Sequence, residues 1–159
     1  MRSELVIALK LEHERLRSLL DRVPADRLVA QPPGVPNHAL WTVGHLAHSM
    51  EAIGGELGLA AWLPEHWAEI HGRGSAPVDD ASAYAGIDVL REALAAGIER
   101  ITQRLEQMEE AELRAPLPDA RFRSTYPTLG HAALHVIASH FAFHVGQLSC
   151  WVEAVQQQR

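Results

Sequence analysis

The chain has 159 residues, of which 47% are hydrophobic and 21% charged, a composition typical of one globular domain and not of a disordered segment. Its net charge of −6 argues against a general nucleic-acid binder, which would carry a basic surface. The single cysteine, Cys150, excludes an intrachain disulfide framework and a cysteine-based zinc ribbon, and we expect it to be a small core residue.

The N-terminal half contains two predicted long helices. The first covers residues 3–23, where apolar residues recur every three or four positions and Pro24 follows. A loop rich in proline and glycine comes next and ends at Asn37. Asn37 can cap a second helix over residues 38–59, because its side chain can accept a hydrogen bond from a free backbone amide of the first turn.

The rest of the chain contains one short and two long predicted helices. The short helix covers residues 64–72, between a proline and a glycine. The long helices cover residues 82–108 and 128–155, and a loop with three prolines separates them. No strand pattern or domain linker is present. The sequence therefore predicts an all-α protein, a four-helix up-down bundle with long connections, forming a single domain over residues 1–159.

The predicted helices also exclude an integral membrane protein. None contains the 18 or so consecutive apolar residues that a transmembrane helix needs. The N-terminal segment carries charges throughout its apolar stretch and so does not resemble a signal peptide. We therefore expect a cytoplasmic protein without a membrane or nucleic-acid partner.

The ten histidines are the unusual feature of the composition, and four of them lie in the last predicted helix. At about 100° per residue, His140 and His144 fall in the centre of its apolar stripe. His131 and His135 fall on the opposite side. The helix thus divides its histidines into an inward pair and an outward pair.

An inward pair at i and i+4 presents two rings on adjacent turns, the spacing at which both can bind one metal ion. The alternative is that each ring forms a hydrogen bond with a buried water, a glutamate or a backbone carbonyl. A catalytic metal site needs a third ligand. The second predicted helix offers His45 and His48, between which the periodicity does not choose. His13 lies on the apolar stripe of the first helix, and we expect it to be a buried neighbour of the site.

Three segments together carry a family resemblance. The second-helix signature of the DinB-like (YfiT-like) superfamily resembles the segment NHALWTVGHLAHSME. Its last-helix signature, H-x-x-x-H followed by Gly-Gln, resembles LHVIASHFAFHVGQLSCW. The middle of one subgroup is similar to WLPEHWAEIHGRGSAPVDDASAY, so the resemblance spans nearly the whole chain.

The resemblance implies an up-down four-helix bundle with a long crossover and a site of three histidines. The His-Leu-Ala match points to His45, and the H-x-x-x-H-x-G-Q match points to His140 and His144. One departure keeps an alternative open. Many relatives have a tryptophan eight residues before the ligand, whereas Trp41 lies four before His45, and alignment on the tryptophan favours His48. We favour His45, since that match is local to the ligand.

The resemblance also implies a function. Three neutral histidines suit a divalent metal, with zinc or nickel expected. Characterised relatives include transferases and isomerases that use low-molecular-weight thiols such as mycothiol or bacillithiol, and others are described as metal-dependent hydrolases. The chain would then be a thiol-dependent S-transferase or a hydrolase acting on a small molecule. The alternative is a non-enzymatic metal-binding or stress-response protein. Relatives often pair, which is compatible with a homodimer formed through an outer helical face.

Overall fold

The computed structural model describes residues 1–158, and helices provide the regular structure of this part of the chain. The long helices are α1 (Arg2–Leu20), α2 (Ala39–Glu56), α4 (Ile87–Gln107) and α7 (Phe141–Gln157). The short ones are α3 (Trp67–His71), α5 (Glu110–Arg114) and α6 (Leu129–Leu134), with 3-10 turns at Ala25–Arg27, Ala81–Ala83 and Ala120–Phe122. A π-helical turn, η4 (His135–His140), joins α6 to α7. The prediction of an all-α bundle is confirmed.

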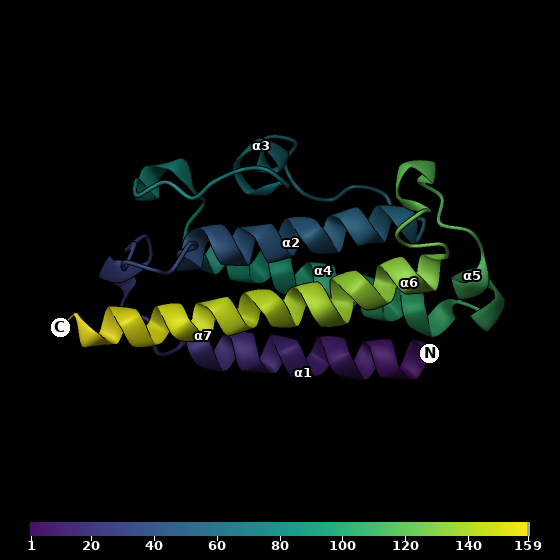
Figure 1. Cartoon of the computed structure of the whole chain (residues 1–159), viewed down its shortest axis with the longest axis horizontal. Helices are drawn as coiled ribbons and strands as arrows, with labels where there is room; N and C mark the ends of the chain where they lie inside the picture. Colours follow the sequence, from purple (N-terminus) through teal and green to yellow (C-terminus); the bar gives the residue numbers. More distant parts are fainter. Residues whose placement is uncertain (159) are drawn as a thin grey trace.

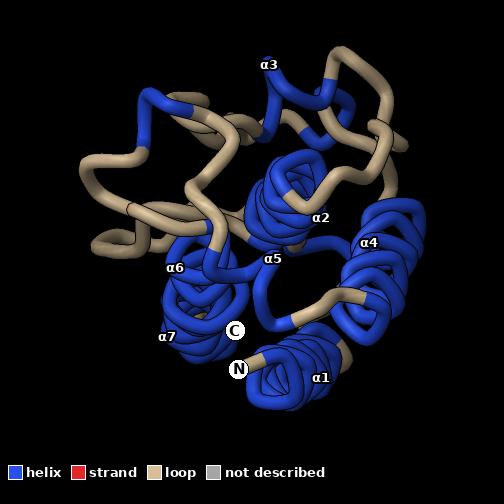
Figure 2. Tube along the Cα trace, turned by 90° about the vertical axis from the view of Figure 1, so that its right-hand side faces the viewer, coloured by secondary structure: helices blue, strands red, loops and turns tan. Residues whose placement is uncertain are grey.

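The four long helices form a ring around one core. Figure 2 shows them nearly end-on, with α2 and α1 diagonally opposite and with α4 and α7 between them. The core residues come from the apolar stripe of each helix. One example from each is fully buried: Leu9, Met50, Ile101 and Leu148. The three- and four-residue spacing predicted these stripes, and their burial supplies most of the stability of such a bundle.

The chain crosses the bundle once between α2 and α4. In Figure 1 both helices run in the same direction, and residues 57–86, which include α3, return the chain along the outside of α2. Two close contacts agree with this parallel pairing, since Gly54 lies against Ile101 and Gly97 lies against Met50. The long connection predicted between these helices is therefore the crossover, and it covers the outer face of α2.

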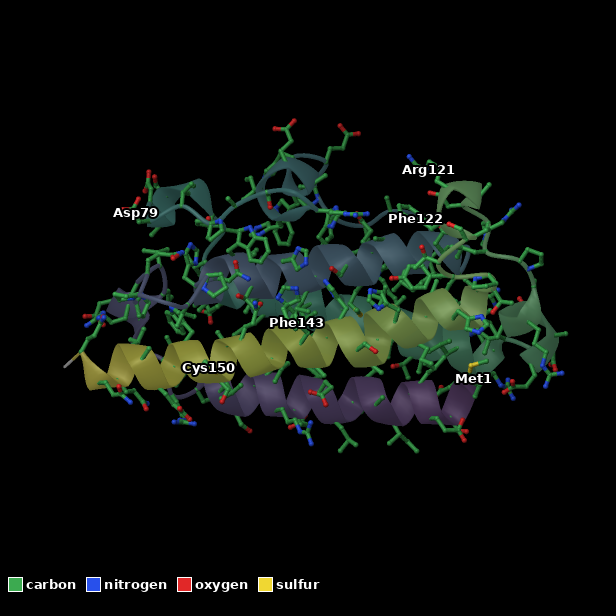
Figure 3. All side chains as sticks on the ribbon, viewed as in Figure 1. Met1, Asp79, Arg121, Phe122, Phe143 and Cys150 are labelled. Atoms are coloured by element: carbon green, nitrogen blue, oxygen red, sulfur yellow. The ribbon has the colours of Figure 1, made fainter. Side chains whose placement is uncertain are left out.

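Two predictions about single residues are wrong: Asn37 does not cap α2, and Cys150 does not lie in the core. The N-cap of α2 is His38, whose Nδ1 accepts the backbone N–H of Trp41 at 3.2 Å. Asn37 instead donates its side-chain N–H to Gln147 on α7 at 3.1 Å. Cys150 is exposed and not in the core, and it lies on the same helix as Phe143, which is 59% exposed (Figure 3).

The predicted extent of the last helix is confirmed, but the helix is not a regular α-helix over its whole length. Residues 129–157 are helical throughout, yet the six residues of η4 follow π geometry. A π turn contains more residues than an α turn, so everything before it is rotated relative to the regular wheel. Within residues 1–158, no helix combines the length and the apolar character that crossing a membrane requires.

Candidate metal centre

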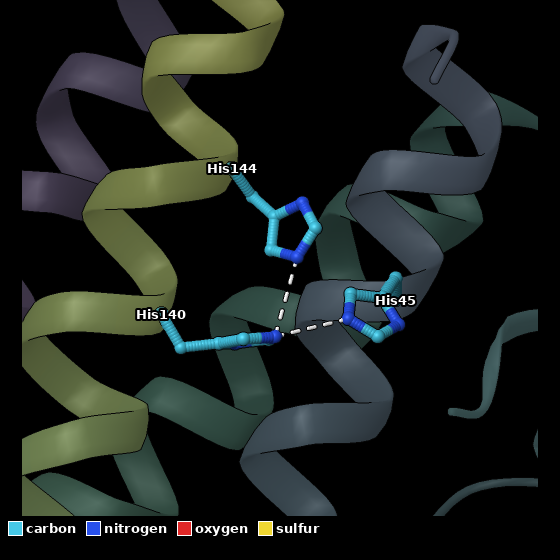
Figure 4. Close-up of side chains that lie close together, drawn as sticks. All are labelled: His45, His140 and His144. Atoms are coloured by element: carbon cyan, nitrogen blue, oxygen red, sulfur yellow. Dashed lines mark hydrogen bonds between the residues drawn. The ribbon is translucent and has the colours of Figure 1, made fainter. Parts of the chain in front are cut away.

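Three histidines from two helices meet on one side of the bundle. The Nε2 atom of His140 lies 3.1 Å from Nε2 of His45 and 3.2 Å from Nε2 of His144 (Figure 4). One ligand atom from each ring lies within 4.8 Å of those from the other two. Helix α2 provides one ring, while the end of η4 and the first turn of α7 provide the others. His45, His140 and His144, the three ligands that the family resemblance implies, thus lie together.

The ring of His45 is held on two sides. Its Nδ1–H donates to the backbone carbonyl of His71 at 2.6 Å. On one face it stacks against the indole of Trp41, with ring centroids 4.6 Å apart and planes 9° from parallel. Because Nδ1 carries the proton in that hydrogen bond, the Nε2 atom of the neutral ring has a free lone pair. That lone pair faces the other two histidines.

All three rings are held in the neutral form. Burial is the main cause that lowers the pKa of His140 to about 4 and that of His144 to about 3, with repulsion from His45 adding to the shift. Burial also lowers the pKa of His45, against the opposing effect of its hydrogen bond to the carbonyl of His71. Neutral imidazoles are the form that binds metal ions.

The donor set fits a divalent cation. A hydrogen bond between two neutral rings needs one N–H and one lone pair, so a single proton on His140 cannot satisfy both neighbours fully. A tetrahedral ion bound at about 2.0–2.1 Å from each nitrogen would need nitrogens roughly 3.3 Å apart, close to the 3.1 and 3.2 Å separations found here. Within residues 1–158 no carboxylate or thiolate joins the group, so three histidines would leave a further coordination position free.

A cavity of about 560 Å³ lies directly beside the cluster. His45 and His140 form part of its wall, together with the aromatic side chains of Trp41 from α2 and of Phe122 and Tyr126 from the loop before α6. A volume of this size matches pockets that bind small molecules. The free coordination position therefore has room for a small ligand beside it.

Two further histidines line this cavity without joining the cluster. His48 is one turn after His45 on α2, and its ring is half-buried. Although the sequence left His48 open as an alternative third ligand, the structure brings His45 and not His48 to the other two rings. His135 also lines the cavity and stacks on Tyr126, with ring centroids 4.9 Å apart.

The position of His135 corrects the helical-wheel prediction, which placed it on the outer face with His131. The cause is the π turn, because it begins at His135 and changes the rotation between that residue and His140. His131 precedes the turn and is exposed, as predicted. His13 was expected beside the site, but it lies in a groove between α1 and α4 with Arg91 and is only half-buried.

The residue that sequence reasoning missed is His71. It contributes a main-chain carbonyl, and no side-chain pattern indicates which carbonyl a ligand histidine will bind. Its only signal in the sequence is its place in the short helix that the Pro64 and Gly72 pattern predicted. The tertiary contact between that helix and α2 was not readable from periodicity.

The comparisons with known proteins agree with this fold. The family model of the DinB superfamily matches residues 8–148. Among solved structures, a conserved protein from Enterococcus faecalis is similar with a TM-score of 0.75 and 20% identity, over 96% of this chain and 94% of that one. The comparison with curated proteins gives no significant match. The helical bundle with its crossover, the cluster of three histidines and the match over most of the sequence lead to one conclusion: the chain belongs to the DinB superfamily.

Proposed function

We propose that this protein is a metal-dependent enzyme acting on a small molecule, with His45, His140 and His144 as the ligands of one divalent cation. The observation that carries the proposal is the convergence of three Nε2 atoms at the wall of a 560 Å³ cavity. A structural site closes its shell with a fourth protein ligand, whereas a catalytic site keeps a position for water or substrate. Three ligands beside a cavity match the catalytic pattern.

When bound, a cation of this kind would act as a Lewis acid that lowers the pKa of a coordinated water toward neutrality and favours the thiolate form of a coordinated thiol. The side chains of the chain itself bind and orient. The carbonyl of His71 keeps the proton of His45 on Nδ1, away from the cation. Trp41, stacked on His45, shields one side of that ring from water. The apolar wall of the cavity favours substrates with an apolar body.

Thiol-dependent S-transfer or hydrolysis is the reaction class that we propose, on the basis of the family. Imidazole ligands suit zinc and nickel equally, so both belong in the test. Turnover assays would use low-molecular-weight thiols with an electrophilic acceptor, and activated esters for hydrolysis. Turnover that depends on added metal supports the enzyme. Tight metal binding without turnover in any of these assays would favour the alternative of a non-enzymatic metal-binding protein.

The metal site itself is tested by elemental analysis of protein loaded with zinc or nickel and then desalted. We expect about one ion per chain in the wild type and a large loss in His144→Ala, because removing one of three ligands leaves an incomplete site. His131→Ala is the matched control, since it removes an exposed histidine of the same helical segment. Full metal content in His144→Ala would contradict the assignment of this residue.

A further inference from the structure

The glycine directly before His45 forms a notch into which another histidine fits. His71 is 1% exposed and its ring lies on the backbone of Gly44. A Cβ atom placed on Gly44 would lie 2.1 Å from Cε1 and 2.3 Å from Nδ1 of His71. These distances are far below van der Waals contact, and the buried ring belongs to a packed helix. Any larger residue at position 44 must therefore displace His71.

The same residue reaches the proposed ligand through its main chain. The carbonyl oxygen of His71 accepts the Nδ1–H of His45 at 2.6 Å, while its side chain occupies the notch one residue earlier on α2. Side chain and carbonyl thus contact two consecutive residues of the helix that carries the ligand. Because both contacts belong to one residue, the seat of the ring in the notch restricts where the carbonyl can lie.

We propose that His71 is a positioning residue of the metal centre: its ring, seated on Gly44, holds its carbonyl against Nδ1 of His45 and so keeps the lone pair of Nε2 toward His140 and His144. This inference rests on the proposed function, since it concerns one of the three proposed ligands. The short helix α3, which lies in the crossover, then positions a ligand in addition to covering α2.

The segment after His71 is tied to α2 by side chains from the first turns of that helix. Nε1–H of Trp41 donates to Oγ of Ser75 at 3.0 Å, and that hydroxyl donates to the carbonyl of Gly72 at 2.8 Å. Nδ1 of His38 accepts an amide N–H at the helix N-cap, so its Nε2–H is free to donate to the carbonyl of Val78 at 2.9 Å. These bonds hold the segment in place without any contribution from a metal ion.

The three rings differ in whether a hydrogen bond holds the nitrogen that faces away from the cluster. Nδ1 of His140 and Nδ1 of His144 are buried and make no hydrogen bond within the described chain, whereas Nδ1 of His45 has a backbone acceptor. Outer partners of ligand histidines fix the ring orientation, and their loss typically lowers metal affinity about 10- to 100-fold. His45 is therefore the ligand whose orientation depends most on a partner.

The test measures zinc affinity by competition with a chromophoric chelator in four full-length proteins: wild type, Gly44→Ala, His71→Ala and the double variant. Gly55→Ala is the matched control, because this glycine also lies in α2 but a Cβ there would meet nothing within 4 Å. We expect Gly44→Ala to bind zinc about 10-fold or more weakly and Gly55→Ala to bind like the wild type. His71→Ala should bind zinc more weakly than the wild type but more tightly than Gly44→Ala, because it loses the ring without pushing the carbonyl away. The double variant should bind like His71→Ala, since removing the ring makes room for the new methyl group.

A second readout is the Nδ1 proton of His45, followed by NMR in the metal-free protein. We expect a protected signal in the wild type that is lost in Gly44→Ala and weakened in His71→Ala. If Gly44→Ala does not fold, His71→Ala carries the same test, because loss of the ring also frees the carbonyl. Circular dichroism would establish folding in each variant.

Two results would overturn the inference: a folded Gly44→Ala protein that binds zinc like Gly55→Ala, or a double variant no better than Gly44→Ala. The second result would mean that the methyl group disturbs α2 directly and not through His71. A wild type that binds no zinc would instead refute the proposed function, while the Nδ1 signal would still report on the contact between His71 and His45.

Discussion

At the scale of the single residue, the chemistry of the site depends on which ring nitrogen carries a proton. His45 donates from Nδ1 to a carbonyl, so its Nε2 is available as a ligand atom. His140 and His144 are held neutral mainly by burial. The chain thus brings three ring nitrogens together at one point, where buried polar groups usually form complete hydrogen bonds.

This neutral state has a consequence for stability. The ordinary histidine pKa of 6.5 falls to about 4 for His140 and to about 3 for His144 in the folded protein. Below about pH 6.5 the unfolded chain therefore binds protons that the folded chain does not, so acidification favours unfolding. We expect the free energy of unfolding of the metal-free protein to decrease as the pH falls from 6.5 toward 4.

Urea denaturation at several pH values in the presence of a chelator measures this effect. The variant His140→Gln/His144→Gln removes both groups and should show a smaller decrease over the same pH range. His131→Ala, which removes an exposed ring, should show the wild-type decrease. An equal pH dependence in the double variant and the wild type would show that these two histidines do not cause the loss of stability.

At the scale of the element, the helix that carries two of the proposed ligands begins with a side-chain cap. Thr128 Oγ1 accepts the backbone N–H of His131 at 3.4 Å and also bonds its Nδ1 at 2.7 Å. Thr128→Ala removes both contacts, and we expect the free energy of unfolding to fall by about 1 kcal/mol. Thr125→Ala, in the exposed loop before it, is the control and should have little effect.

Chemical denaturation of the two variants would measure this difference. A loss of similar size in Thr125→Ala and Thr128→Ala would mean that the cap contributes nothing specific. Metal content should be unchanged in both variants, because the cap lies several residues before the nearest proposed ligand. A loss of metal in Thr128→Ala alone would show that the start of α6 also positions His140.

The helices show where prediction from sequence succeeds and where it stops. Apolar periodicity located all four long helices and placed His140 and His144 on the inner face, because burial of an apolar stripe is encoded locally. The π turn at His135–His140 is not visible in that periodicity, which assumes 3.6 residues per turn throughout. His135 is therefore predicted on the wrong face. The expectation for His13 fails for a different reason, since periodicity does not tell which neighbouring helix a side chain will face, and His13 lies between α1 and α4.

The choice between His45 and His48 shows a second limit of prediction from sequence periodicity. Both lie beside the apolar stripe of α2, and periodicity alone left them equal. The family resemblance favoured His45, and the structure places this ring beside His140. The contact that orients it comes from His71, which is 26 residues further along the chain. Such contacts between a crossover and a helix follow from tertiary packing and are not contained in local patterns.

At the scale of the whole molecule, the crossover explains why the site lies where it does. Because α2 and α4 run parallel, residues 57–86 must return along the outside of the bundle, where they cover α2 (Figure 1). The carbonyl of His71 in this connection contacts His45. The same side of α2 faces η4 and the loop that contains Phe122 and Tyr126. The cavity thus has walls from the bundle and from both long connections.

The most direct test of this account is a crystal structure of the zinc-loaded protein. We predict one ion bound by the Nε2 atoms of His45, His140 and His144, with a water or another exogenous ligand in the position that faces the cavity. An ion bound elsewhere, or a shell closed by a fourth protein side chain, would contradict the proposal of a catalytic metal centre.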